Sequence, residues 1–419
     1  MKRFFTFSFV ATAILFLFGG FFLVGRMMQF RSTVADLKAD GFPVSIADLQ
    51  IQSAAGESDA TSQFSRLLGP LGSFETEMYK DQEINERPVD ESTIKLFNEL
   101  DAAYPTVFPL ISEIANSDFV GFESKSIGPD SKPDKLTGSD EDLSKAYGAQ
   151  ETLDLELLRL QQVRSCARVL QFKARVLAAQ GKPDEALQSV MQIFKITNVF
   201  GRHPTLVAHL VRCACRGIAI GSAYEILAEH PLSKESRSEL NEILEGADAT
   251  EEYDWTLVSE RAFGTAILSE MGTIPLASSG NAYLDLISDE LEQCGEEEFA
   301  KDFSFENEIS WFDGTFAKLI LPALQQTRVA NARIRSQVRG LRILNALTAA
   351  PEAKDKEVDQ KYLLSLGVPE AMTVDTMNGE SMKVKKLDDD WVVYSVGPNL
   401  IDDGGDSHAI KDFVVGPLK

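Results

Sequence analysis

A long uncharged segment lies near the start of this chain, from Phe4 to Val24, and Phe, Leu, Ile, Val, Ala and Gly dominate it. About 20 apolar residues are needed to cross the core of a bilayer as an α-helix, so this segment is just long enough. A cleavable signal peptide has a shorter apolar region, about 7–15 residues, followed by a small-x-small cleavage site. The residues from Gly25 to Phe30 offer no such site. We therefore expect a transmembrane anchor with its flanks over residues 1–30.

The basic residues around this anchor are nearly balanced. Lys2 and Arg3 precede the apolar segment, and Arg26 and Arg31 follow it. An excess of such residues favours the cytoplasmic side of a membrane, so the count alone decides little. We expect a single pass through the cytoplasmic (inner) membrane, with the bulk of the chain outside the cytoplasm. A loop near the C-terminus, described below, is the second reason for this orientation.

The net charge of -23 is not offset by any long basic tract. Nucleic-acid binding requires clustered Lys and Arg to neutralise phosphates, so we expect no nucleic-acid partner. The one cationic cluster lies on a predicted helix among Val, Ile and Leu, and it consists of Arg328, Arg333, Arg335, Arg339 and Arg342. Such a cluster is typical of the solvated face of an amphipathic helix, with a membrane or nucleic-acid patch as the alternative.

The middle of the chain has the periodicity of α-helices. From Leu153 to Leu177, apolar residues recur at steps of three and four, which places them on one helix face. The run from Gly181 to Pro183 breaks this helix, and Asp184 and Glu185 open the next one with acids in its first turn. The pair resembles one hairpin of a tetratricopeptide-type repeat. Because a repeat domain needs about three such units, we interpret it as an ordinary helical hairpin.

Further helices are predicted over residues 204–228, 234–245, 251–271, 282–294 and 319–349. We therefore expect a mainly α protein with an N-terminal transmembrane helix, a multi-helix ectodomain and a small C-terminal antiparallel β unit. The expected divisions are an N-terminal helical region over residues 31–122, an exposed loop or linker over 123–148, a helical domain over 149–350 and the β unit over 351–419. The linker prediction rests on a composition rich in Ser, Lys, Asp, Gly and Pro.

Motifs that carry a catalytic mechanism are missing from the sequence. There is no phosphate-binding Gly-rich loop followed by Lys, no dinucleotide fingerprint, no His-Glu-x-x-His and no Gly-x-Ser-x-Gly. His203 and His209 are six residues apart, which places them on opposed helix faces. The cysteines show no metal-binding spacing and are expected to be buried, although a disulfide from Cys166 to Cys213 or Cys215 stays open. We expect no enzymatic activity.

The C-terminal segment has a distinct order of elements. A turn from Asp375 to Gly379 leads to a predicted strand over residues 381–386 and a second strand from Trp391 to Val396, whose alternation buries one face. The run from Tyr394 to Pro398 reads Tyr-Ser-Val-Gly-Pro, and Asp-Asp-Gly-Gly follows over residues 402–405.

These runs resemble the C-terminus of a set of membrane-anchored planctomycete proteins and, less closely, the globular end of the type II secretion major pseudopilin. In the latter family a turn, a hairpin and a Tyr-Ser-Leu-Gly strand lead to an acidic, Gly-rich calcium loop. The resemblance covers roughly the last sixth of the chain and implies a location and a form rather than a reaction. Thr376 stands where the family turn has Pro. The segment from Phe4 to Val24 lacks the prepilin cleavage pattern and its acidic residue, so we expect no pseudopilin-type processing.

The acidic loop is a candidate calcium site. Asp402, Asp403, Asp406 and Asp412 supply carboxylates, and the two glycines between them let backbone carbonyls turn inward. Calcium takes about 6–8 oxygen ligands, and extracellular modules bind it at about 10⁻⁴–10⁻³ M, which favours a site outside the cytoplasm. The alternative is that Asp and Gly are simply good turn residues in water.

The sequence favours a single-pass cell-envelope protein with a structural or protein-interaction role and a protein partner that the sequence does not identify. Two alternatives stay open. Co-purification with pilins would favour an accessory component of a secretion or pilus-type system. A deep pocket that combines His203 or His209 with carboxylates of shifted pKa would favour an extracytoplasmic enzyme.

Overall fold

The computed structural model of the chain describes residues 24–45, 47–49, 56–80, 84, 88–121, 149–203, 205–248, 251–271, 274–293, 314–387, 390–406 and 411–417. The predicted anchor from Phe4 to Val24, apart from Val24 itself, lies outside these ranges. The predicted linker over residues 123–148 and Cys294 lie outside them as well. Expectations that concern those residues stay predictions.

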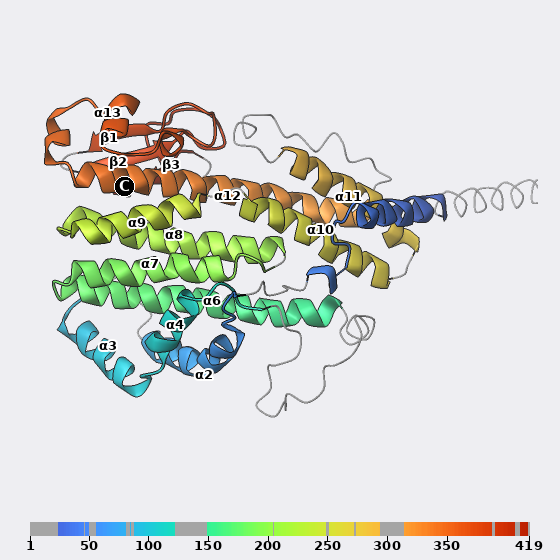
Figure 1. The fold of residues 1–419 in the computed structure, drawn as a ribbon, viewed down its shortest axis with the longest axis horizontal. Coiled ribbons are helices and arrows are strands. Elements are labelled where there is room, and N and C mark those ends of the chain that lie inside the picture. Colours follow the sequence, from blue (N-terminus) through green and yellow to red (C-terminus); the bar gives the residue numbers. More distant parts are fainter. Residues whose placement is uncertain are drawn as a thin grey trace, which may run out of the picture.

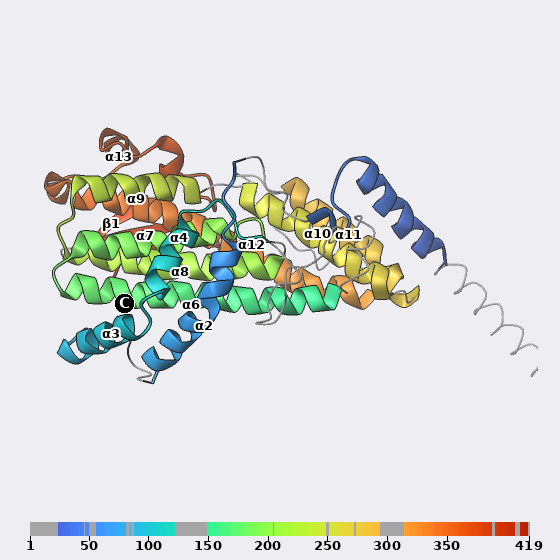
Figure 2. The same ribbon diagram turned by 60° about the horizontal axis from the view of Figure 1, so that its bottom comes forward.

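Helices build most of the described chain, as the sequence predicts, and the longest of them lie side by side along one axis of an elongated molecule (Figures 1 and 2). A first helix spans residues 24–39 and is followed by a short 3₁₀ helix, η1 (Ala47–Leu49). The α-helices that follow are α2 (Thr61–Met78), α3 (Glu91–Ala103), α4 (Val107–Ala115), α6 (Ala149–Ala179), α7 (Pro183–Val199), α8 (Leu206–Glu229), α9 (Lys234–Ala247), α10 (Glu251–Met271), α11 (Ile274–Gln293) and α12 (Gly314–Thr348).

The predicted helical hairpin is the pair α6 and α7. Gly181 lies between them with a φ of 74°, a left-handed conformation that favours glycine. The Lys182 N–H donates to the carbonyl oxygen of Leu177 at 3.0 Å, which closes the last turn of α6. Pro183 then occupies the first turn of α7, where its missing N–H costs nothing. Local turn chemistry therefore explains why the sequence predicted this hairpin correctly.

Other helix bounds agree less evenly with the predictions. The helix α10 covers the predicted residues 251–271. By contrast, α11 begins at Ile274 rather than at 282, and α12 begins at Gly314 rather than at 319, with Pro322 inside it. Helix starts of this kind depend on tertiary packing as well as on local signals.

Two apolar clusters hold the helices together. The larger cluster joins α2 to α4, α6 to α9, α12 and the C-terminal unit, and the second joins α10, α11, the first part of α12 and the first helix. Phe30 of the first helix lies directly against Gly280 of α11, where any side chain would strike its ring. Within the described residues, only α8 is long and apolar enough to cross a membrane, and it is mostly buried inside the larger cluster.

The C-terminal unit contains the predicted small antiparallel sheet. Three short helical segments, η4 (Pro351–Asp355), α13 (Gln360–Ser365) and η5 (Glu370–Thr373), precede the strands β1 (Lys383–Leu387), β2 (Asp390–Ser395) and β3 (Phe413–Val415). The sheet order is β1-β2-β3, with Lys383 opposite Tyr394 and Val393 opposite Val415. The first two strands lie within a few residues of their predicted positions, whereas β3 was not predicted.

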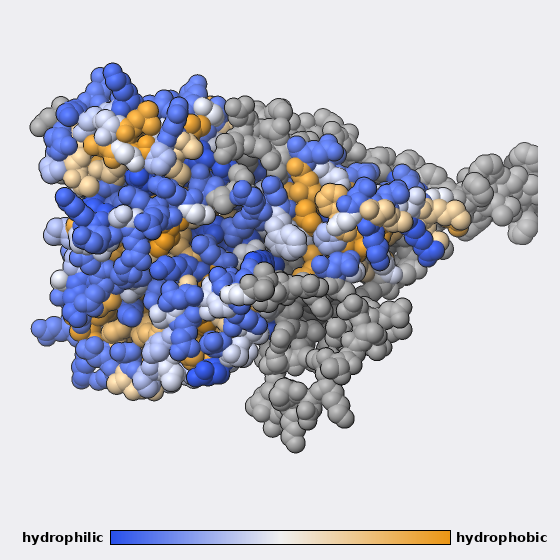
Figure 3. Space-filling view, viewed as in Figure 1, coloured by the Kyte–Doolittle hydropathy of each residue, from blue (hydrophilic) through white to orange (hydrophobic). Residues whose placement is uncertain are grey.

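The sheet packs directly on α12, above the helical bundle (Figure 1). The face of the molecule seen in this view is mostly hydrophilic, with apolar residues in separate patches (Figure 3). Gly340 of α12 permits the contact between the helix and the sheet, because a Cβ there would lie 3.0 Å from Val415 and 3.7 Å from Val393. Val393 and Val415 belong to the same apolar cluster as the bundle helices. The C-terminal unit therefore shares its core with the rest of the molecule.

Candidate functional site

The structure brings the predicted calcium residues into one loop between β2 and β3. Asp412 accepts hydrogen bonds from the backbone N–H groups of Asp403 at 3.3 Å and Gly405 at 2.5 Å. Asp402 accepts from the Tyr394 hydroxyl at 3.1 Å and from the N–H of Gly404 at 3.0 Å. These carboxylates therefore organise the loop through the chain's own donors. The proximity of Asp402 raises the pKa of Tyr394, in addition to the larger effect of burial.

Two lysine ammonium groups also contact this loop. Lys411 donates to Asp406 at 2.7 Å, and Lys385 of β1 donates to the carbonyl oxygen of Gly404. The remaining predicted ligand, Asp403, accepts from the Asn399 amide at 2.8 Å. Across the part of the chain that the structure describes, no three His, Cys, Asp or Glu side chains are arranged to hold a metal. Calcium binding at these residues therefore remains a prediction from the sequence.

The turn at Asp375 ties the C-terminal unit together. The Asp375 side chain is fully buried, and its carboxylate accepts hydrogen bonds from the Ser395 hydroxyl at 2.6 Å, from the Val396 N–H at 2.9 Å and from the Met377 N–H at 2.8 Å. One carboxylate thus joins the turn to the end of β2. These three donors satisfy the buried carboxylate, so its role is structural.

Thr376, which follows Asp375, also has a structural role. Its hydroxyl lies 2.5 Å from the Ser336 hydroxyl and 3.3 Å from the carbonyl oxygen of Ala332, both on α12. Arg339 of α12 donates to the carbonyl oxygen of the neighbouring Val374 at 2.7 Å. These contacts fasten the turn to the bundle.

The expectation that the cationic cluster is a solvated face is wrong for four of its five arginines. Only Arg333 is exposed, and it stacks on the Phe413 ring with 4.9 Å between guanidinium and ring centre. The side chains of α12 are covered by α8 and α9 on one side and by the C-terminal sheet on the other, so more than one stripe of this helix is buried. The buried members, all at most 7% exposed, are Arg328, Arg335, Arg339 and Arg342.

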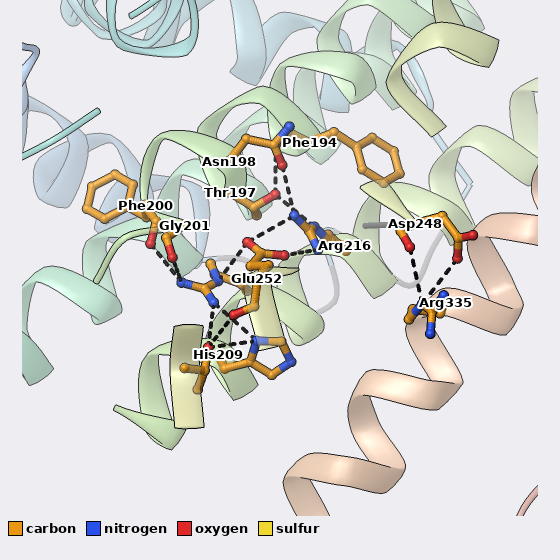
Figure 4. A network of polar contacts seen from close by, with 12 residues as sticks. Phe194, Thr197, Asn198, Phe200, Gly201, His209, Arg216, Asp248, Glu252 and Arg335 are labelled. Atoms are coloured by element: carbon orange, nitrogen blue, oxygen red, sulfur yellow. Dashed lines mark hydrogen bonds and ion pairs between the residues drawn. The ribbon is translucent and has the colours of Figure 1, made fainter. Parts of the chain in front are cut away.

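Buried arginines of α12 and of α8 form ion pairs with carboxylates inside the protein. Asp248, which follows α9, lies 3.3 Å from Arg335 and 2.9 Å from Arg339. Glu252 at the start of α10 lies 3.2 Å from Arg212 and 2.7 Å from Arg216, both on α8. Figure 4 shows Asp248 directed at Arg335 of α12, and Glu252 directed at Arg216 of α8.

Burial and charge act in opposite directions on Glu252. Burial raises the pKa of this carboxyl, but Arg216 and Arg212 outweigh it and lower the pKa to about 2. Removing either Glu252 or its arginines would leave an uncompensated buried charge. The three side chains, here called the Glu252 network, therefore stabilise the protein only together. This network joins the start of α10 to α8.

The two histidines singled out in the sequence are core residues. His203 is fully buried, and its Nε2 lies 3.0 Å from the carbonyl oxygen of Val120. His209 is 1% exposed, with Nδ1 at 3.1 Å from Arg212, and burial followed by the charge of Arg212 lowers its pKa to about 3. His209 is therefore neutral at pH 7. Neither histidine lines either of the two cavities described next.

Two cavities lie at the end of the bundle where α6, α8 and α12 terminate. The first, here called the α6–α8 cavity, has a volume of about 440 Å³ and is bordered by the last turns of α6 and α8 and by Pro88 and Val89. The second, the α8–α12 cavity, has a volume of about 390 Å³ and lies between the ends of α8 and α12 and the start of β2. Glu229 and His230 line both cavities and separate them. Sequence reasoning missed them, because they form where distant helix ends meet.

Comparisons with protein-family models, with curated proteins and with solved structures found no match for this chain.

Proposed function

We propose that this chain is a single-pass cell-envelope protein that is anchored by the segment from Phe4 to Val24 and presents a helical body to a protein partner. The bulk of the chain lies outside the cytoplasm in this proposal, and its role is structural or interactive rather than catalytic. Calcium at the loop from Asp402 to Asp412 is part of the same proposal, since it would suit a calcium-rich compartment.

The arrangement of the two ends of the molecule carries the proposal. The first helix docks at the end formed by α10 and α11, where Asn281 donates to the carbonyl oxygen of Arg26 at 3.1 Å. The two cavities lie at the opposite end, where α6, α8 and α12 terminate (Figures 1 and 2). An anchor that precedes residue 24 would hold the first end at the membrane and present the cavities away from it.

A partner-binding role is favoured over catalysis by the positions of the histidines. The enzyme alternative called for His203 or His209 in a pocket with carboxylates of shifted pKa. Both histidines instead make structural contacts in the core, with Val120 and with Arg212 respectively.

Labelling of an exposed cysteine from outside the cell tests this topology. Ala228 is exposed at the end of α8, and Cys166, Cys213 and Cys215 are buried. In a Cys294→Ala background, Ala228→Cys should react with a membrane-impermeant maleimide in intact spheroplasts, and alkaline washing should leave the chain in the membrane. Labelling only after lysis would place the body in the cytoplasm and overturn the proposal.

A second candidate is an accessory component of a secretion or pilus-type system. The succession of turn, hairpin and acidic Gly-rich loop in the C-terminal unit supports it, since this order is the one expected from the pseudopilin resemblance. Co-purification with pilins after mild crosslinking would distinguish it from an independent envelope protein.

A further inference from the structure

The α6–α8 cavity combines an apolar wall with an unpaired hydroxyl. Ala174, Ala178 and Ile226 line one side of it. Ser222 also lines it, is 3% exposed, and has a hydroxyl without a hydrogen-bond partner among the described residues. A buried hydroxyl left unpaired costs free energy, and the volume of about 440 Å³ falls within the range of ligand pockets. Both observations indicate that the cavity receives a polar group.

Two carboxylates stand at the rim of this cavity. Glu225 and Glu229 are four residues apart on α8 and therefore share a helix face. Among the residues that the structure describes, neither forms an ion pair or accepts a hydrogen bond. Burial raises the pKa of Glu225, the charge of Arg175 opposes this and the charge of Glu229 adds to it. Within the described residues, the two carboxylates therefore exceed the one cation of the cavity lining, Arg175, and neither is in direct contact with it.

The helix ends add further negative potential. The carbonyl ends of α6, α8 and α12 meet at this end of the molecule, and none of their last turns carries a basic residue (Figure 1). A helix C-terminus bears a partial negative charge and favours a cation nearby. Each cavity is also lined by one arginine that has acceptors of its own. Arg175 lines the α6–α8 cavity and donates to the carbonyl oxygen of Ile84 at 2.9 Å, and Arg237 lines the α8–α12 cavity and donates to Asn345 and Thr348 at 2.9 Å.

We infer that the α6–α8 cavity binds the ammonium group of a lysine side chain from a protein partner, an inference that rests on the interaction role proposed above. The aliphatic stem lies against Ala174, Ala178 and Ile226. The ammonium group reaches Glu225 and Glu229 and gives the Ser222 hydroxyl a donor.

The neighbouring α8–α12 cavity is the reason to assign the lysine to a polypeptide rather than to a free amine. It shares Glu229 and His230 with the first cavity and is lined by Tyr224 and Trp391 together with leucines of α8 and α12. An extended segment that places a lysine in one cavity can therefore place an adjacent apolar residue in the other. Asp390, Arg237 and Lys354 line it together with Glu229, so its charges balance and its contribution to binding is mainly apolar.

Ligand-observed NMR with the full chain in non-ionic detergent tests this inference. The probes are Nα-acetyl-lysine N-methylamide, its uncharged norleucine analogue and the free diamine cadaverine. The site variant is Glu225→Gln/Glu229→Gln, and the matched control is Glu235→Gln/Glu242→Gln, which removes two exposed carboxylates from α9. Ala178→Leu fills the cavity without changing any charge.

We expect the blocked lysine to bind in a salt-sensitive manner and the norleucine analogue to bind at least about tenfold more weakly. The site variant and Ala178→Leu should each reduce lysine binding about tenfold or more, and the control should leave it unchanged. Equal binding of the lysine and norleucine probes, or binding that survives in the site variant, overturns the cation site. Binding of cadaverine without the blocked lysine overturns the polypeptide source. A body located in the cytoplasm would refute the proposed function and leave these binding results unaffected.

Discussion

At the scale of single residues, His209 and Glu252 make stability depend on pH. The folded protein holds His209 neutral down to a pKa of about 3, whereas an unfolded chain binds that proton below about 6.5. Glu252 has a folded pKa of about 2 against an ordinary value of 4.5. Both folded pKa values are depressed, so both groups contribute stability at neutral pH that is lost as the pH falls.

We therefore predict that the free energy of unfolding decreases as the pH falls from 6.5 towards 3, with Glu252 contributing only below about pH 4.5. His209→Gln keeps a hydrogen-bond acceptor for Arg212 and should flatten the slope between pH 6.5 and 4.5, by up to about 1.4 kcal/mol per pH unit. Urea unfolding at several pH values measures this slope. His230→Gln is the control, and an unchanged slope in His209→Gln would show that His209 is not the responsible group.

Asp248 gives a second prediction at this scale. Asp248→Asn removes the carboxylate that Arg335 and Arg339 share, and leaves two buried guanidinium groups without it. We expect a loss of about 3–5 kcal/mol in the free energy of unfolding. Glu245→Gln is the matched control, because Glu245 is 47% exposed where it meets Arg342 and should cost about 1 kcal/mol or less. Equal effects of the two substitutions in denaturant titrations would contradict the burial argument.

At the scale of elements, Gly397 explains the Gly-Pro that ends β2. It has a φ of 66°, and a Cβ there would overlap the carbonyl oxygen of Lys411 just before β3. Gly379 has a similar φ of 71° but open space around it. Gly397→Ala should therefore lower stability by at least about 2 kcal/mol, and Gly379→Ala by about 1 kcal/mol. Thermal unfolding and hydrogen exchange at β2 and β3 measure the effects of the two substitutions. A larger loss of stability in Gly379→Ala than in Gly397→Ala would exclude the short distance between residue 397 and the Lys411 carbonyl oxygen as the cause.

The loop between β2 and β3 gives the calcium prediction. Calcium would have to displace the ammonium groups of Lys385 and Lys411 from Gly404 and Asp406. We expect millimolar calcium to raise the melting temperature slightly, and to raise it more in Lys385→Gln/Lys411→Gln. Asp402→Asn/Asp406→Asn should abolish both responses. If calcium changes the melting temperature of neither the unsubstituted chain nor Lys385→Gln/Lys411→Gln, calcium has to be removed from the proposal.

The elements also show which features could be predicted from the sequence. Local signals sufficed for the α6–α7 hairpin, where glycine and proline specify the turn, and for the positions of β1 and β2. The expectation that β2 buries only one face is wrong, because every residue from Trp391 to Ser395 is buried. The strand β3 has three residues, too few for a period to be read. The arginines of α12 were misassigned because a helix buried on two sides presents more than one stripe to the core. The cavities depend on three helix ends that are far apart in sequence.

At the scale of the whole molecule, the C-terminal unit is part of a shared core rather than a detachable module. Arg342 of α12 donates to the carbonyl oxygen of Gly367 at 2.8 Å, and Val393 and Val415 pack in the bundle's own apolar cluster. Removing the unit would expose the face of α12 around Gly340, which Val393 and Val415 cover.

We therefore predict one cooperative unfolding transition for the bundle and the C-terminal unit together. In scanning calorimetry the calorimetric and van't Hoff enthalpies of this transition should agree, because neither part has a complete core without the other. A chain that stops after Ala350 should aggregate or melt well below the intact protein. Exposing the apolar face of α12 to water should lower the free energy of unfolding by more than a single core substitution does. A soluble truncated chain with an unchanged melting temperature, or two separate transitions in the intact protein, would show instead that the C-terminal unit folds on its own and is carried as an independent module.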